Sequence, residues 1–221
     1  MKNNKYTILF DVDSLIYSSC YNVDSAEDAM YKFDESYYNI INTIEESFEI
    51  KNVLNFGLSR GNFRKEIYHD YKANRNNRKL PDYWGEVAEH VANHFELLSP
   101  TGIETDDIVA RESRKIDNTI ICSIDKDYMQ IPGLIYNYNK QKFYDVSEEY
   151  ALRSLFTQMV VGDSSDNVNF CKGYGVKYAD RLFKDCTTKY QFMRKTFELF
   201  KQIYKSKARE KFILCYKLLK I

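Results

Sequence analysis

Carboxylate side chains occur in short groups along this chain of 221 residues, and most of the groups are expected at or just after the ends of β-strands. The groups are Asp11 and Asp13; Glu104, Asp106 and Asp107; Asp125 and Asp127; and Asp163 and Asp166. In an open α/β sheet the carboxyl ends of the strands face one crevice, where ligands bind. Acids that meet there repel one another and cannot all stay ionised without cations. Hard oxygen donors suit Mg²⁺ or Mn²⁺, and two such ions about 4 Å apart could activate a water and stabilise the leaving oxygen of a phosphodiester.

Each acidic group also has an ordinary structural interpretation. A lone Asp-x-Asp after a strand is common. Asp106 and Asp107 could complement the dipole of a helix that begins near them, and GDSSDN alone could be a turn. The metal hypothesis therefore depends on all four groups occurring in one short chain, in positions that can converge.

Hydrophobic patterning predicts the elements that would position these acids. Short apolar runs predict strands, and apolar residues at helical spacing predict helices. The expected strands are 6–10, 52–56, 119–124, and a hairpin of 134–138 and 142–146; the expected helices are 26–48, 87–98, 105–116, 147–161, 176–183 and 191–219. We expect Thr105 and Ser147 to be N-caps and Gly162 to end its helix. Strands that alternate with helices predict an α/β fold with a mainly parallel sheet and flanking helices.

Basic residues gather in two parts of the chain, although the formal net charge is zero. The segment from Arg60 to Lys79 has no clean period and contains seven Lys and Arg against Glu66 and Asp70, and the chain after Lys172 is also rich in lysine. Such segments could place phosphates beside metal ligands, or could be solvated surface. Gly173 and Gly175 predict a tight turn that opens a helix, where backbone N–H groups and Lys177 could approach a phosphate.

Composition narrows the protein class. Hydrophobic residues at 44% and charged residues at 29% are typical of a globular domain. No apolar run is long enough for a signal peptide or a membrane span, and five cysteines without a C-x-x-C pair do not indicate a disulfide framework or a zinc site. We expect a cytoplasmic protein of one domain over residues 1–221, without a membrane partner.

The order of the motifs resembles the flap endonuclease / 5′-3′ exonuclease family in its small bacteriophage-like form. The segments that carry this resemblance are DVDSL at 11–15, NFRKEIYHDYKANR at 62–75, ETDD at 104–107, SIDKD at 123–127 and GDSSDNVNFCKGYGVKYA at 162–179. The family implies a helical arch, here about 57–98, and a helix-hairpin-helix segment that grips duplex DNA, here about 162–186, commonly around K⁺. The helical tail of 187–221 matches no motif.

The resemblance also implies roles for single residues. Asp11, Glu104 and Asp106 would hold the first of two metal ions, and the second would be held or surrounded by Asp107, Asp125, Asp127, Asp163 and Asp166. Arg64, Tyr71, Lys72 and Arg75 would lie in or near the arch. Lys72 and Arg75 would address the scissile phosphate, and Tyr71 could stack on a base.

The same resemblance predicts the substrate class and the partners. The expected activity is 5′-3′ exonuclease or 5′ flap endonuclease cleavage of branched, flapped or nicked DNA, with RNA–DNA hybrids as a further substrate. We expect a monomer, with replication proteins as partners.

Two departures from the family pattern stand out. The family usually has an aspartate shortly before the arch, where this chain has Gly57 or Ser59, so that the first metal would be bound more weakly or Asp13 would substitute. The hairpin reads NFCKGYG instead of a glycine-rich G-x-x-G-x-G, which puts the potassium ion in doubt.

Two alternatives stay open at this point. FDVDS and GDSSDN also resemble the first and last motifs of haloacid-dehalogenase-like phosphatases, in which Asp11 would be the nucleophile, Asp13 the acid/base, and Asp163 and Asp166 metal ligands. That interpretation leaves ETDD, SIDKD and YKANR unexplained. The second alternative is a non-catalytic protein that binds branched DNA, which the missing acid before the arch would favour.

Overall fold

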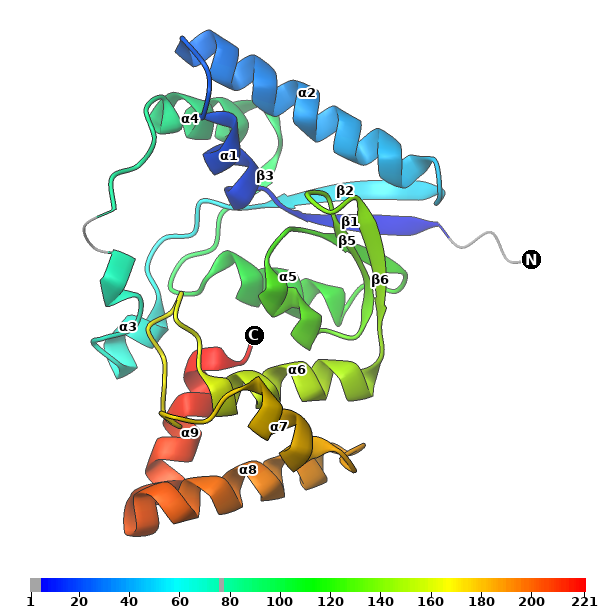
Figure 1. Cartoon of the computed structure of the whole chain (residues 1–221). Helices are drawn as coiled ribbons and strands as arrows, with labels where there is room; N and C mark the ends of the chain where they lie inside the picture. Colours follow the sequence, from blue (N-terminus) through cyan, green and yellow to red (C-terminus); the bar gives the residue numbers. More distant parts are fainter. Residues whose placement is uncertain (1–4, 76–77) are drawn as a thin grey trace. The chain divides into compact units, whose positions relative to one another are not determined.

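The computed structural model describes residues 5–75 and 78–221 (Figure 1). The chain divides into two compact units. The first unit consists of Met1–Gly61, Lys79–Tyr128 and Gly133–Asp145, and the second consists of Asn62–Arg78, Met129–Pro132 and Val146–Ile221. Each unit is described separately below.

The first unit contains the sheet and four of the α-helices. Its strands are β1 (Tyr6–Asp11), β2 (Ile50–Phe56), β3 (Leu97–Leu98), β4 (Thr119–Cys122), β5 (Gly133–Asn137) and β6 (Lys142–Val146). Its α-helices are α1 (Asp13–Ser19), α2 (Ala26–Glu45), α4 (Trp84–His94) and α5 (Thr105–Ser113), and the 3₁₀ turn η2 (Lys126–Gln130) follows β4. The sheet order is β3-β2-β1-β4-β5-β6, and the pairs β3–β2, β2–β1, β1–β4 and β4–β5 are parallel. The expected α/β class with a mainly parallel sheet is confirmed.

The central strand β1 shows why both faces of this sheet are covered by helices. Ile8 and Phe10 belong to a core shared with α1, α2 and α4, while the alternate residue Leu9 is also fully buried. Since successive strand residues point to opposite faces, both faces must be apolar, as parallel sheets require. Figure 1 shows α1, α2 and α4 over one face and α5 against the other. This arrangement places the carboxyl ends of β1 and β4 side by side.

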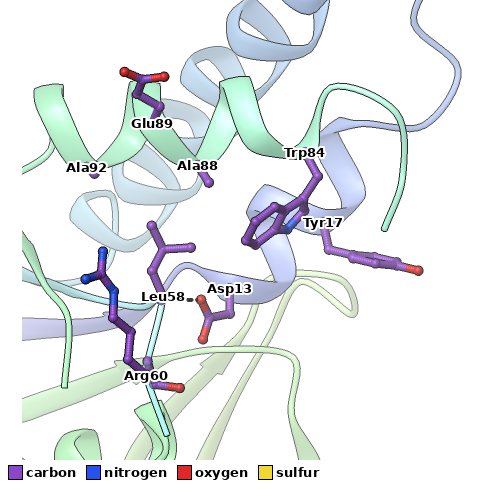
Figure 2. A pocket seen from close by; sticks show the side chains of 9 residues that line it. Asp13, Tyr17, Leu58, Arg60, Trp84, Ala88, Glu89 and Ala92 are labelled. Atoms are coloured by element: carbon purple, nitrogen blue, oxygen red, sulfur yellow. Dashed lines mark hydrogen bonds between the residues drawn. The ribbon is translucent and has the colours of Figure 1, made fainter. Parts of the chain in front are cut away.

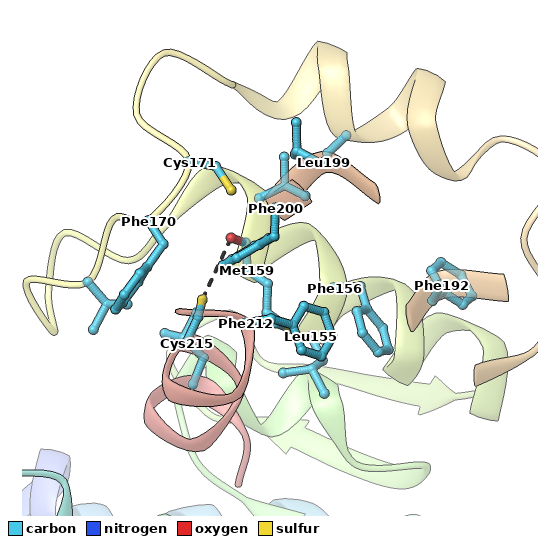
Figure 3. Close-up of a cluster of buried hydrophobic side chains, with 14 of the residues drawn as sticks. Leu155, Phe156, Met159, Phe170, Cys171, Phe192, Leu199, Phe200, Phe212 and Cys215 are labelled. Atoms are coloured by element: carbon cyan, nitrogen blue, oxygen red, sulfur yellow. Dashed lines mark hydrogen bonds between the residues drawn. The ribbon is translucent and has the colours of Figure 1, made fainter. Parts of the chain in front are cut away.

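The second unit is helical and has its own core (Figure 3). Its elements are α3 (Phe63–Ile67), η1 (Ala73–Arg75), α6 (Glu148–Val161), α7 (Val176–Phe183), α8 (Lys189–Tyr204), η3 (Lys205–Lys207) and α9 (Ala208–Leu219). Phe156 stacks on Phe192 with ring centroids 5.7 Å apart, and Phe200 packs edge-on against Phe212 at 5.5 Å. Burying each such ring stabilises the fold by about 1.5–3 kcal/mol, so aromatic packing joins α6, α8 and α9.

Several element boundaries follow the predictions and others do not. Ser147 caps α6 by accepting a hydrogen bond from Tyr150 N at 3.1 Å, and Gly162 ends that helix with a φ of 85°. The helix predicted over 87–98 was wrong at its end, because Leu97 and Leu98 pair with β2. The predicted helix of 191–219 is interrupted at Lys205, whose φ of 51° breaks the helical path between α8 and α9.

No helix in the described ranges is long and apolar enough to cross a membrane.

Candidate functional site

Asp11 ends β1 and is the most buried acid of the first unit. Its Oδ2 accepts hydrogen bonds from Tyr128 Oη at 2.8 Å and from Ser123 Oγ at 3.4 Å, and its Oδ1 accepts one from Asp13 N at 3.2 Å. Burial, followed by the charge of Asp13, raises the pKa of Asp11 to about 7, although the Tyr128 hydrogen bond acts in the opposite direction. No local pattern marks Tyr128 as a partner of Asp11, since it is one of 19 tyrosines.

Asp13 occupies the space beside Gly57, one of the two positions, with Ser59, where the expected family acid is absent. Its Oδ1 accepts a hydrogen bond from Leu58 N at 2.7 Å, and its Oδ2 accepts one from Thr105 Oγ1 at 2.7 Å. A Cβ on Gly57 would lie 2.9 Å from Asp13 Oδ1 and 2.9 Å from a Val12 methyl carbon. A side chain at 57 would therefore collide with Asp13, and the carboxylate nearest to this position comes from α1.

The start of α5 contributes the ETDD acids. Glu104, not the expected Thr105, is the N-cap, and it forms a reciprocal capping box with Asp107. The Thr105 hydroxyl faces Asp13 instead of capping the helix, which is the reason for the difference. Asp106 Oδ1 accepts a hydrogen bond from Asp107 N at 2.7 Å. Glu104 and Asp107 thus already perform a helix-capping role that competes with metal binding.

Asp125 and Asp127 follow β4, as predicted. Asp125 is exposed; its backbone N donates to Ser123 Oγ at 3.1 Å and its Oδ1 accepts from Asp127 N at 2.9 Å. The same Ser123 hydroxyl contacts Asp11, so one serine links the ends of the neighbouring strands β1 and β4.

The acids of the first unit act on one another electrostatically. The charges of Asp13 and Asp125 both raise the pKa of Asp11, and those of Asp11, Asp106 and Asp125 add to burial in raising the pKa of Tyr128. Among the residues that the structure describes, no three His, Cys, Asp or Glu side chains form a closed metal-binding arrangement. The donor set is nevertheless all oxygen, which is the chemistry that Mg²⁺ and Mn²⁺ prefer.

The raised pKa of Asp11 predicts that Asp11→Asn stabilises the protein in EDTA at pH 8. The pKa of this carboxyl is about 7 in the folded state, against an ordinary value of 3.8. The free energy of unfolding therefore decreases as the pH rises from 3.8 to about 7, because the unfolded state ionises more readily. At about 1.4 kcal/mol per unit the cost is about 4 kcal/mol. The amide loses one acceptor, which costs about 1–2 kcal/mol, so we expect a net gain of about 2 kcal/mol.

Urea unfolding at pH 8 and pH 4 measures this effect. At pH 4 the carboxyl is protonated in the folded state and half protonated in the unfolded state, so the gain should be lost, and the missing acceptor should leave Asp11→Asn about 1–2 kcal/mol less stable than the wild type. Asp117→Asn, at an exposed position before β4, is the matched control and should change little at either pH. An Asp11→Asn variant that is less stable than the wild type at pH 8 would contradict the assignment of Asp11 as a strained buried acid.

The GDSSDN segment lies in the second unit and follows α6, so its acids do not stand at a strand end as the sequence suggested. Asp163 is 1% exposed and organises the turn. It accepts hydrogen bonds from Gln158 Nε2 at 2.8 Å, Ser165 N at 2.7 Å and Asp166 N at 3.2 Å, as well as from the Ser165 hydroxyl. Gly162 has no room for a side chain, because a Cβ would lie 2.6 Å from Val168 O. Asp163 Oδ1 accepts three of these hydrogen bonds and Oδ2 accepts one, so Asp163 is primarily tied into the turn.

Asp166 joins this turn to the basic YKANR segment. Its Oδ2 accepts a hydrogen bond from Tyr71 Oη at 3.0 Å, while its Oδ1 lies 3.2 Å from Arg75 Nη2 and 3.5 Å from Lys72 Nζ. Lys72 N donates to Asp166 O at 2.9 Å, and Arg75 Nε donates to Ser165 O at 2.9 Å. The structure therefore brings Tyr71, Lys72 and Arg75 together around one buried carboxylate.

Two residues predicted to contact DNA have buried side chains. Arg64 is 1% exposed and donates to Leu218 O at 3.0 Å and Lys220 O at 2.9 Å. Tyr71 is 2% exposed and packs in the core of the second unit. The Arg64 guanidinium is buried because it satisfies free carbonyls at the end of α9, and the Tyr71 hydroxyl is buried because it donates to Asp166. DNA contact by either residue stays a prediction.

The predicted phosphate-binding turn stands before α7. Gly173 adopts a φ of 93°, which favours glycine, and Gly175 is the N-cap of α7. Lys177 is exposed in the first turn of this helix. Within the predicted range 162–186 the described helix is α7, and α6 precedes the connecting loop.

Comparisons with known proteins agree with the sequence resemblance. The family model described as the 5′-3′ exonuclease, N-terminal resolvase-like domain matches residues 6–154. The DNA polymerase I of Rhizobium leguminosarum is 34% identical over 146 residues, which cover 59% of this chain and 14% of that protein. A 5′-3′ exonuclease of Buchnera aphidicola subsp. Schizaphis graminum is 28% identical over 181 residues, covering 74% and 62%. The chain thus spans less than two thirds of the length of either relative.

Solved structures share the fold. The bacteriophage T5 D15 protein co-crystallised with metal ions has a TM-score of 0.70 at 15% identity, covering 97% of this chain and 89% of that one. The T5 D15 flap endonuclease in a pseudo-enzyme-product complex with DNA and metal ions has a TM-score of 0.65 at 14% identity, covering 97% and 99%. The family model covers more than half of the chain, so this chain belongs to the 5′-3′ exonuclease family, and the resemblance inferred from its motifs is confirmed.

Proposed function

We propose that this chain is a divalent-metal-dependent nuclease that hydrolyses phosphodiester bonds at or near the 5′ ends of DNA. The observation that carries the proposal is the group of acids at the carboxyl ends of β1 and β4 and the start of α5, in a member of this family. Relatives named 5′-3′ exonuclease and DNA polymerase I support the reaction class. The T5 flap endonuclease, which shares the fold, has been crystallised with DNA and metal ions, which supports both the metal and the substrate class.

The proposed metal-binding residues of the first unit are Asp11, Asp13, Asp106 and Asp125, with Glu104, Asp107 and Asp127 close to them in sequence. Two Mg²⁺ or Mn²⁺ ions, once bound, would supply an activated water and neutralise charge on the phosphodiester. Tyr128 and Ser123 orient Asp11, and Leu58 N and Thr105 orient Asp13. In this proposal Asp13 replaces the metal-binding aspartate that the family usually has before the arch.

The proposed DNA contacts come from exposed or partly exposed cations of the second unit. The Arg75 side chain is 40% exposed and Lys72 is 17% exposed, so each can reach a phosphate by exchanging its contact with Asp166. Lys177 and the free N–H groups at the start of α7 would bind duplex backbone. In this proposal Asp166 positions the basic segment, and Asp163 keeps the turn in shape. The family resemblance further implies a direct or water-mediated contact of Asp163 and Asp166 with the second metal.

The proposal predicts cleavage that requires a divalent cation. The protein is incubated with a 5′-labelled flap, a nicked duplex and an RNA–DNA hybrid, each in Mg²⁺, in Mn²⁺ and in EDTA, and the products are mapped. We expect short 5′ products in either metal and none in EDTA, because the clustered acids cannot bind a phosphodiester without cations. Undiminished cutting in EDTA would overturn the metal requirement.

The products also show which type of cleavage the protein performs and which substrates it cuts. Single nucleotides indicate exonuclease action, a released flap indicates endonuclease action, and cutting of the hybrid indicates removal of RNA primers. Tight binding of the flap without products in any metal would favour the non-catalytic alternative. A potassium requirement for duplex binding would support an ion near Gly173–Gly175. The phosphatase alternative has no supporting observation, since Asp163 follows a helix and not a strand.

A further inference from the structure

The two carboxylate oxygens of Asp11 accept different numbers of hydrogen bonds. Within the described residues, Oδ2 accepts from Tyr128 Oη at 2.8 Å and from Ser123 Oγ at 3.4 Å, whereas Oδ1 accepts from Asp13 N alone, at 3.2 Å. An ionised carboxylate has about four lone-pair positions, about two on each oxygen. Both positions on Oδ2 are therefore occupied by hydroxyl groups, and one position on Oδ1 stays available to a cation.

Packing fixes the two hydroxyl groups that occupy Oδ2. The Tyr128 side chain, in η2, is fully buried, and Ser123 is 1% exposed. The Ser123 hydroxyl accepts a hydrogen bond from Asp125 N at 3.1 Å, so its own hydrogen is directed toward Asp11. An ionised carboxylate cannot donate, so the Tyr128 hydroxyl is the donor as well. Residues that follow β4 thus determine which oxygen at the end of β1 is free.

Asp13 is not restricted in this way, although it lies two residues further along the chain. Its Oδ1 accepts from Leu58 N, the contact drawn in Figure 2, and its Oδ2 accepts from Thr105 Oγ1, each at 2.7 Å. Each oxygen therefore keeps one free position. Asp13 also borders a cavity of about 710 Å³ between α1, the segment after β2 and α4, with Trp84 on the α4 side. The restriction to one oxygen is thus specific to Asp11, with its buried tyrosine.

A carboxylate with one available oxygen suits some cations better than others. Mg²⁺ demands near-ideal octahedral geometry and takes few carboxylates, whereas Ca²⁺ accepts six to eight oxygens in flexible geometry, often both oxygens of one carboxylate. Two oxygens of the same carboxylate subtend a narrow angle at the ion, which an octahedron does not accommodate. Blocking Oδ2 therefore removes a mode of binding that Ca²⁺ can use and Mg²⁺ cannot.

We propose that Tyr128 is a positioning residue that makes Asp11 a one-oxygen ligand and thereby favours Mg²⁺ over Ca²⁺ at the metal site. The inference rests on the proposed metal-dependent nuclease function, from which it takes that Asp11 binds a divalent cation. It goes beyond that function by assigning the choice of cation to a buried tyrosine outside the set of ligands. Tyr128 acts through Asp11 and contacts neither the cation nor the substrate.

Tyr128→Phe tests the proposal, because it removes the hydroxyl and keeps the ring that fills the core. The full chain is loaded with Mn²⁺ at pH 8 without DNA. Mg²⁺ or Ca²⁺ is then added until half of the bound Mn²⁺ has been released, as measured by electron paramagnetic resonance. The ratio of the Mg²⁺ concentration to the Ca²⁺ concentration does not depend on how tightly each variant binds Mn²⁺. Hydrogen-bond partners of metal ligands change metal affinity about 10–100-fold, so this ratio should rise at least about tenfold in Tyr128→Phe.

An unchanged ratio in Tyr128→Phe would overturn the proposal. The matched control is Tyr37→Phe, which also removes a buried hydroxyl in the first unit, one that donates to Asn55 Oδ1 at 2.9 Å. Tyr37→Phe should unfold at a lower urea concentration than the wild type and keep the wild-type ratio. An equal shift of the ratio in Tyr37→Phe would show that loosened packing is the cause, and would also overturn the proposal.

Two further variants separate a positioning role from a purely structural one. Ser123→Ala removes the longer hydrogen bond and should raise the ratio by less than Tyr128→Phe, which keeps the test decisive even if Tyr128→Phe folds poorly. In the Asp11→Asn background, Tyr128→Phe should leave the ratio unchanged, because Asp11 no longer binds the cation as a carboxylate. A shift that persists in that background would show that Tyr128 does not act through Asp11.

Failure of this proposal can be told apart from failure of the nuclease proposal. If the wild type cuts the flap in Mg²⁺ and Tyr128→Phe keeps the wild-type ratio, the role of Tyr128 is wrong and the nuclease function stands. If the wild type cuts nothing in any metal, but the ratio shifts in Tyr128→Phe and not in Tyr37→Phe, the role of Tyr128 stands and the nuclease function is wrong.

Discussion

Asp125→Asn is expected to lower the rate of flap cleavage at saturating Mg²⁺ by at least about a hundredfold, because charge stabilisation by a bound metal is worth several kcal/mol. Asp125 is exposed, and the oxygen that accepts a hydrogen bond from Asp127 N can be kept by an asparagine. The substitution therefore removes a charge while the loop after β4 keeps its hydrogen bonds. DNA affinity should be unchanged or slightly higher, since one negative charge near phosphates is lost.

Single-turnover cleavage and binding in EDTA measure the two quantities separately. Asp145→Asn, at an exposed position on β6 of the same unit, is the matched control and should cleave like the wild type. Cleavage by Asp125→Asn at the wild-type rate would show that the metal-binding group has been misassigned. A rate of Asp125→Asn that returns to the wild-type value at saturating Mg²⁺ would show that Asp125 contributes to metal affinity and not to the cleavage step.

Lys72→Ala is expected to lower the saturating single-turnover rate by at least about a hundredfold, with a modest loss of DNA binding. Removal of one oriented donor that stabilises transition-state charge costs about 3–4 kcal/mol. Lys72 Nζ is 3.5 Å from Asp166 Oδ1, and Tyr71 and Arg75 also contact that carboxylate, so the variant leaves Asp166 paired. The expected loss is thus in the rate and not in the fold.

Lys177→Ala should show the opposite pattern, because Lys177 is an exposed residue at the start of α7. Loss of one phosphate contact should weaken binding and reduce the slope of log K against log salt by about 1, with the saturating rate unchanged. Lys65→Ala, exposed on α3, is the control for nonspecific charge loss. If Lys72→Ala mainly weakens binding and leaves the rate intact, the catalytic role of the YKANR segment is wrong.

Asp166 is the buried carboxylate that the basic YKANR segment surrounds. A buried carboxylate between a tyrosine, a lysine and an arginine is compensated by hydrogen bonds and opposite charge, as a buried charge must be. The sequence alone suggested a metal ligand, because GDSSDN resembles an acidic metal motif. The structure adds that Asp166 contacts basic side chains that come from more than 90 residues earlier in the chain, and its role as a metal ligand stays a prediction.

Local sequence was enough to predict much of this protein. The apolar run before Asp11 predicted β1, and Ser147 and Gly162 marked the ends of α6. The order of the motifs resembled a known family, and that resemblance proved correct. These features depend on interactions within a few residues: side-chain alternation, a capping hydroxyl and a glycine at positive φ. Such features can be predicted from the sequence because the interacting residues lie within one short segment.

Only the tertiary structure decided what several side chains do. Arg64 is buried because the carbonyls at the end of α9, 154 residues later, accept its hydrogen bonds. Asp13 lies against Gly57, and Thr105 turns to Asp13 and leaves the N-cap to Glu104. The cavity at Trp84 is formed by α1, the segment after β2 and α4 together. Each of these outcomes depends on a partner that is distant in sequence, and neither residue type nor local spacing specifies which partner that will be.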